Sequence, residues 1–225
     1  ILLEANPDSA YILLNEVKTP DRLNERQFAR WCMLYCRAAD KLFKDMLYTE
    51  QLDRALAWCK NHGTAEQRAW MGLYLGRSYV KDKLFIPAMK AYSDALSLAK
   101  EKYLYDVAGY ICSYMADLYT YTGQRSEERR KFEEAAEFFK QAGNERSYAF
   151  ALRDVAKTWA FDDSLSLALH YMLIADSVIT RFQDLRGISS ISNGLGNIYD
   201  LMGDVEKARA YYSRSLSSDT MDIWL

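Results

Sequence analysis

Hydrophobic residues recur at intervals of three and four positions along nearly the whole chain, which is the spacing of an amphipathic helix. The alternating pattern of a half-buried strand bounded by turn residues does not occur. Only Pro7, Pro20 and Pro87 interrupt the sequence, so few positions force a helix to end. The hydrophobic pattern predicts an all-α protein.

Four columns of residues repeat with a period of 40 positions and no insertion. The first column is small and the second, three positions later, is largely aromatic; the third is large and apolar and the fourth is mostly alanine. The columns are Cys36, Gly76, Ala116, Ala156 and Gly196; Ala39, Tyr79, Tyr119, Trp159 and Tyr199; Leu52, Tyr92, Phe132, Met172 and Tyr212; and Ala55, Ala95, Ala135, Ala175 and Ser215. Such a period predicts stacked copies of one supersecondary unit.

Each unit has the pattern of two antiparallel helices. The small column lets the two helices approach closely, and we expect the aromatic of the Tyr199 column to fill the space beside that contact. Gly123 and Gly203 suit the left-handed position that ends a helix, and Thr64 followed by Gln67 has the spacing of a capping box. Further expected N-caps are Asp8, Ser126, Asn144, Asp204 and either Asp163 or Ser164.

We expect one array of these units over residues 1–225. Its predicted segments are 1–22, the helical part of a truncated unit; 23–63, a degenerate hairpin; 64–103, 104–143, 144–183 and 184–218, four regular repeats; and 219–225, the start of a further helix or a tail.

The stretches "LGRSYVKDKLFIPAMKAYSDAL" and "LGNIYDLMGDVEKARAYYSRSL" resemble tetratricopeptide repeats (TPRs), whose units have about 34 residues. The longer period here implies longer helices or wider turns. The resemblance implies an α-solenoid, a right-handed superhelix of stacked antiparallel helix-turn-helix hairpins. The opening "ANPDSAYILLNEV" is also similar to TPR proteins of gut Bacteroidetes, many of which carry an export or lipoprotein leader. That similarity implies a periplasmic or envelope-associated protein, with a cytoplasmic one as the alternative.

Composition narrows the classes of function. Half of the residues are hydrophobic and 14% are aromatic, enough to bury a substantial core, while the net charge of −2 argues against nucleic-acid binding. No apolar run reaches the length of a membrane-spanning helix. The four cysteines form no CxxC pair and have no histidine at zinc-ligand spacing, so we interpret them as small buried thiols and predict no metal.

No catalytic pattern is present in the sequence. His62 and His170 lie in different repeats and outside any HExxH setting, and the fragment from Gly194 to Gly196 lies within a helical pattern rather than after a strand. We therefore predict a non-catalytic protein without a cofactor, and keep an enzyme with an unrecognised helical active site as the remote alternative.

The TPR resemblance implies that the first helices line a concave groove that binds peptides or partner helices. The residues expected there are Arg77, Tyr74, Tyr110, Tyr114, Asp117, Tyr121, Arg153, Asp154, Lys157, Asn193 and Asn197. Arg153, Lys157, Asn193 and Asn197 are expected to form one polar patch that holds a carboxylate or a peptide backbone. In the alternative interpretation, the aromatic column Trp70, Tyr110 and Phe150 only packs between adjacent first helices.

The sequence thus predicts a protein- or peptide-binding scaffold. The alternative is a sensor or regulator whose signalling or DNA-binding segment lies outside this chain. An end of the array without a polar cap would also allow homo-association.

Overall fold

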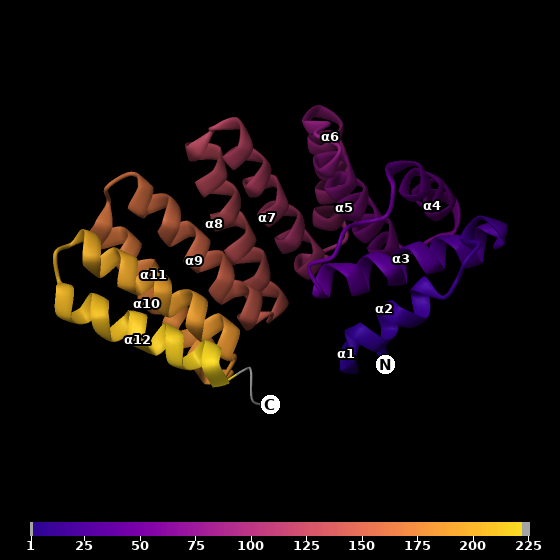
Figure 1. Ribbon diagram of the computed structural model, residues 1–225. Helices are drawn as coiled ribbons and strands as arrows, with labels where there is room; N and C mark the ends of the chain where they lie inside the picture. The colour runs from indigo at the N-terminus through magenta and orange to yellow at the C-terminus, as the bar shows by residue number, and fades with distance from the viewer. Residues whose placement is uncertain (1, 222–225) are drawn as a thin grey trace. The chain divides into compact units, whose positions relative to one another are not determined.

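The computed structural model describes residues 2–221, and these residues form helices and turns without a strand. The helices are α1 (Leu2–Ala5), α2 (Pro7–Asn15), the 3-10 helix η1 (Pro20–Arg22), α3 (Glu25–Lys41), α4 (Thr49–His62), α5 (Ala65–Lys81), α6 (Phe85–Glu101), α7 (Tyr105–Thr122), α8 (Arg125–Ala142), α9 (Glu145–Phe161), α10 (Leu165–Arg181), α11 (Leu185–Leu201) and α12 (Val205–Met221). They follow one another as hairpins (Figure 1). The predicted all-α fold of helix-turn-helix units is confirmed.

The chain divides into two compact units, Ile1–Ile111 and Cys112–Leu225, and the division falls within α7. In the first unit, each helix from α3 to α6 packs against the next, and in the second unit the same holds from α8 to α12. In addition, α3 contacts α5 and α9 contacts α11. Within each unit, these two pairs of first helices therefore lie side by side, as the first helices of stacked hairpins do in a solenoid.

The small column brings the two helices of a hairpin together, as expected. A Cβ atom on Gly76 would lie 2.3 Å from Cε1 of Tyr92, and one on Gly196 would lie 2.5 Å from Cε1 of Tyr212. The aromatic that fills this space therefore comes from the second helix, from the column of Tyr212. The Tyr199 column packs beside this contact: the buried ring of Tyr199 stacks on Tyr211 of α12, with ring centroids 5.5 Å apart.

The hairpin turns use a left-handed residue at the same position of every unit. The residue is Gly123 or Gly203 in two turns, as expected, with φ of 71° and 80°. In the other turns the position is held by Phe43, Lys83 and Asp163, with φ between 54° and 59°. Asp163 is thus the turn residue and not an N-cap.

Some of the expected caps are present and others are not. Thr64 and Gln67 form the capping box, Asn144 accepts from the backbone N–H of Ser147, and Asp204 accepts from that of Lys207. Ser126 lies inside α8, Ser164 makes no capping hydrogen bond, and Asn6 rather than Asp8 caps α2. At the other end, α12 continues to Met221, so residues 219–221 start no new helix. Residues 222–225 lie outside the described part of the chain.

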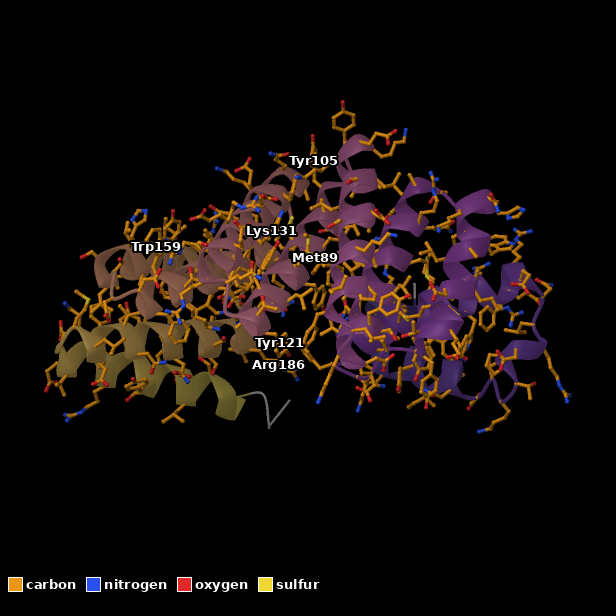
Figure 2. All side chains as sticks on the ribbon, turned by 90° about the horizontal axis from the view of Figure 1, so that it is seen from above. Met89, Tyr105, Tyr121, Lys131, Trp159 and Arg186 are labelled. Atoms are coloured by element: carbon orange, nitrogen blue, oxygen red, sulfur yellow. The ribbon has the colours of Figure 1, made fainter. Side chains whose placement is uncertain are left out.

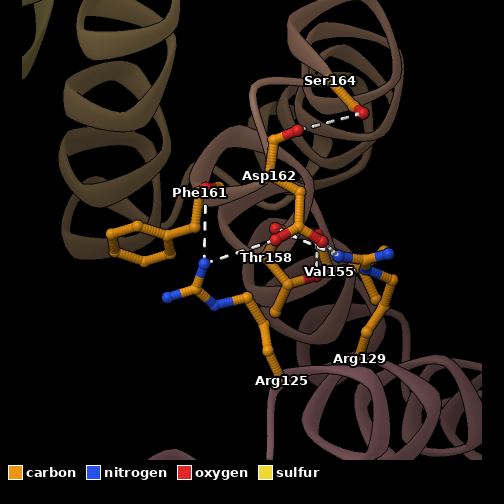
Figure 3. A network of polar contacts seen from close by, with 7 residues as sticks. All are labelled: Arg125, Arg129, Val155, Thr158, Phe161, Asp162 and Ser164. Atoms are coloured by element: carbon orange, nitrogen blue, oxygen red, sulfur yellow. Dashed lines mark hydrogen bonds and ion pairs between the residues drawn. The ribbon is translucent and has the colours of Figure 1, made fainter. Parts of the chain in front are cut away.

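A polar network ties α8 to the C-terminal end of α9 (Figure 3). The guanidinium of Arg129 lies 3.7 Å from the ring centroid of Trp159, donates to Oγ1 of Thr158 at 3.0 Å and pairs with Asp162. Arg125 pairs with the same carboxylate at 3.3 Å. The hydrogen bond from Arg129 lowers the pKa of Asp162. These contacts fix the end of α9, which contributes to the groove described next.

Candidate binding groove

A groove of about 450 Å³ lies between α9 and α11 in the unit Cys112–Leu225. Its residues combine polar groups, apolar side chains and two positions without a long side chain. They are Lys157, Ala160, Phe161, Met172, Ser190, Asn193, Gly194, Asn197, Ile198 and Leu201. Lys157, Asn193 and Asn197, three of the four residues of the expected polar patch, meet in this groove.

Helical spacing explains the arrangement of these side chains. Lys157 and Phe161 are four positions apart on α9, as are Asn193, Asn197 and Leu201 on α11, so each set forms one stripe along its helix. Phe161 is 70% exposed and Leu201 is 63% exposed. The groove therefore has a polar middle and an apolar end at the C-termini of both helices.

Asn197 is oriented from behind by the second helix of its hairpin. The hydroxyl of Tyr212 donates to Oδ1 of Asn197 at 2.8 Å, and the ring of Tyr212 packs where Gly196 has no Cβ. With Oδ1 occupied, the amide nitrogen of Asn197 remains as a donor toward a ligand. The donor is held in place before any ligand arrives.

The floor of the groove depends on Gly194. A Cβ atom at this position would lie 2.6 Å from Cε of Met172, so the missing side chain makes room for the methionine of α10. Met172 is otherwise buried. Gly194 lies within a helix, as expected, but nothing in the sequence showed that Met172 would reach it.

Arg153 borders the groove rather than lining it. Its guanidinium donates to both carboxylate oxygens of Asp154 at 2.9 Å and to Oγ of Ser190 at 2.9 Å, and it lies 4.9 Å from the ring centroid of Phe150. Lys157 pairs with the same Asp154 at 3.1 Å. Two cations share one carboxylate, so this side of the groove keeps one excess positive charge. Asp154 and Arg153 thereby position Lys157 and Ser190.

The expected residues on α7 of the same unit lie outside the groove lining. Tyr121, labelled in Figure 2, is 69% exposed, Tyr114 is half-buried and Asp117 is exposed. Their role in binding stays a prediction.

The expected residues in the other unit have structural contacts. Tyr74 is fully buried, so its assignment to a groove surface was wrong, and burial together with the nearby Asp40 raises the pKa of its hydroxyl. Arg77 forms an ion pair with Asp40, which joins α5 to α3. Tyr110 lies 5.5 Å from Trp70 between ring centroids, so this pair packs between first helices, as the alternative interpretation held.

The part of the chain that the structure describes contains neither a candidate metal site nor a candidate membrane-spanning helix. Within residues 2–221, no group of three or more His, Cys, Asp or Glu side chains is arranged to hold a metal ion. None of the helices in this range is long and apolar enough to cross a membrane.

The chain is similar to known proteins in its fold and not detectably in its sequence. No family model matches the sequence, and no curated protein matches it. Solved structures do match. BtubC (BKLC) from P. vanneervenii has a TM-score of 0.73 and 16% identity, over 98% of this chain and 92% of that one. The TPR-like repeats of a putative kinesin light chain from Podosopora anserina have a TM-score of 0.61 and 13% identity, over 91% of this chain and 98% of that one.

The chain has a TPR-like fold. A Rap protein in complex with Competence and Sporulation Factor is also similar, with a TM-score of 0.69 and 11% identity, over 97% of this chain and 72% of that one. At these identities the likeness to TPR-like proteins concerns the fold alone.

Proposed function

We propose that this TPR-like chain is a non-catalytic scaffold that holds a peptide segment of a partner protein in the groove between α9 and α11. The groove itself carries the proposal, because its volume of about 450 Å³ falls within the range of ligand sites and it is open along two parallel helices. The similar Rap protein, which was solved with Competence and Sporulation Factor, supports a binding role for this fold.

The chemistry of the groove fits an extended peptide. Asn193, Asn197 and Lys157 supply donors for peptide carbonyls or a carboxylate, and the excess positive charge beside Asp154 favours an acidic group. The apolar end formed by Phe161 and its neighbours suits one hydrophobic side chain of the ligand. A peptide with an apolar residue next to an acidic or terminal carboxylate matches both parts.

A catalytic role has no support in the same groove. Its described lining contains no His and no Cys, and Ser190 accepts from Arg153 rather than donating to a base. We therefore retain binding as the function. A sensor or regulator with its output segment outside this chain would use the groove in the same way, and the test below applies to both.

The test starts from peptides selected from a random display library on the full chain. Their affinities are then measured by fluorescence anisotropy for the wild type and for Asn193→Ala/Asn197→Ala. We expect the double variant to bind about thirtyfold more weakly, because it loses two amide hydrogen bonds of roughly 1 kcal/mol each. Tyr212→Phe should also weaken binding, since it releases the amide of Asn197.

The matched control is Asn61→Ala/Gln141→Ala, which removes two exposed amides outside the groove. It should bind the selected peptides as the wild type does. Selected peptides that bind the groove variant as tightly as the wild type would contradict the proposal.

A further inference from the structure

A second cleft lies in the other unit, Ile1–Ile111, between α3 and the C-terminal end of α4. Its volume is about 440 Å³. The residues that matter here are Arg26, Arg30, Met33 and Leu34 of α3 and Trp58 and His62 of α4. No Asp or Glu is among the described residues that line it, so the cleft has a net positive charge.

The two arginines are the unusual feature of this cleft. Arg26 and Arg30 are four positions apart, so their side chains start about 6 Å apart on one face of α3. Neither makes a hydrogen bond or an ion pair with any described residue, whereas Arg54 and Arg77 of the same unit are both paired with carboxylates. Like charges at this spacing repel each other, so an anion between them would be stabilising.

An aromatic wall faces this charge. Trp58 and His62 are also four positions apart, and their rings stack with centroids 4.9 Å apart and planes inclined by 16°. Nδ1 of His62 lies 3.1 Å from the carbonyl oxygen of Trp58, and since a carbonyl only accepts, Nδ1 donates. The stack is thus held rigid at the edge of the cleft.

The packing rules of the repeat do not account for the arginines. Forty positions on, Arg26 and Arg30 correspond to Glu66 and Trp70, and a further 40 positions on, Tyr110 occupies the column of Arg30. Trp70 and Tyr110 pack against each other between first helices. At the position of a packing residue, Arg30 carries a charge that no described residue pairs, which points to a ligand rather than to the core.

We propose that this cleft binds a phosphate monoester, with Arg26 and Arg30 as ligands of the phosphoryl group and Trp58 against its organic part. Two guanidinium groups match the charge and the oxygen geometry of a phosphate dianion. A carboxylate carries one charge and would leave one arginine uncompensated. The ester is either a small molecule or a phosphorylated side chain of a partner protein, since both present the same group.

The test follows the indole N–H resonance of Trp58 in the 15N-labelled full chain, assigned with Trp58→Phe. The probes are phenyl phosphate, adenosine 5′-monophosphate and a phosphotyrosyl peptide, with benzoate as the monoanionic comparison. We expect a saturable shift with at least one phosphate ester and an affinity about tenfold or more above that for benzoate. The stronger of the mononucleotide and the peptide identifies the source of the ester.

The decisive variant is Arg26→Gln/Arg30→Gln, which should weaken phosphate binding about tenfold or more. Its matched control is Lys60→Gln/Lys90→Gln, which removes the same charge from exposed positions outside this cleft and should bind as the wild type does. All four side chains are exposed, and circular dichroism checks that both variants fold. An equal loss in both variants, or no saturable shift with any phosphate ester, would overturn the proposal.

Discussion

Because α5 and α6 approach each other closely at Gly76, we predict that a side chain at this position destabilises the hairpin. Gly76→Ala adds a methyl group 2.3 Å from Cε1 and 2.5 Å from Cδ1 of Tyr92. Tyr92 is only 1% exposed, so its ring cannot turn aside into solvent. The two helices of the hairpin have to separate, or the ring has to leave its rotamer.

The magnitude follows from two opposing effects. Overpacking a core costs about 1–3 kcal/mol, and the distances to Tyr92 place this case near the upper end. Replacing a glycine by alanine within a helix stabilises it by about 1 kcal/mol. The net prediction for Gly76→Ala is a loss of about 2 kcal/mol in unfolding free energy. In the Tyr92→Leu background the ring is gone, and the same change should stabilise by about 1 kcal/mol.

Hydrogen exchange of the backbone amides in α5 and α6 measures both values locally. A local measurement is needed because repeat arrays do not always unfold in one step. The change of sign between the two backgrounds is the signature of the close approach. If Gly76→Ala had the same effect in both, the contact with Tyr92 would not be the reason for the glycine.

Two further predictions concern the turns and the buried thiols. Lys83 has a φ of 59°, where glycine is favoured, so Lys83→Gly should raise the unfolding free energy by about 1 kcal/mol in the same exchange experiment. The control Lys90→Gly, within α6, should lower it by about 1 kcal/mol. A lower unfolding free energy for Lys83→Gly would refute this explanation of the turn. Burial raises the pKa of Cys32 and raises that of Cys36 to about 12. Since the folded values lie above the unfolded value of about 8.5, this stability is complete below pH 8.5 and is lost as the pH rises toward 12. Denaturation at a series of pH values should show a shallower alkaline loss for Cys36→Ala, and equal slopes would contradict the assignment.

The helices could be predicted from the sequence because their pattern is local, and the turns only in part. Gly123 and Gly203 indicate a left-handed conformation because they are glycines. Phe43, Lys83 and Asp163 adopt the same conformation although they are not. The position in the repeat determines their backbone, because the packed helices on either side fix the path of the chain. Comparing turns across the period would have found them.

The groove was predictable where one helix supplies the pattern. Lys157, Asn193 and Asn197 follow from helical spacing together with the TPR resemblance, which implies that the first helices line a groove. The bond of Arg153 to Ser190 and the reach of Met172 below Gly194 depend on how α9, α10 and α11 pack, which no single segment encodes.

The cleft lined by Arg26 and Arg30 could not be predicted from the sequence for a related reason. The sequence shows Arg26 and Arg30 as ordinary charges on a helix, and only the fold shows that no described residue pairs with them and that they share a cleft with Trp58 and His62. Tyr74 was expected in the groove because it lies on a first helix, and its burial depends on how α5 packs against its neighbours, which no single segment encodes.

The central claim is that a peptide binds between α9 and α11. It is tested most directly by following the side-chain amide resonances of Asn193 and Asn197 in the full chain as a display-selected peptide is added. We predict that these amides show the largest shifts, saturating with the peptide, and that Tyr212→Phe reduces the shift of Asn197. Saturable binding that leaves both amides unchanged would contradict it.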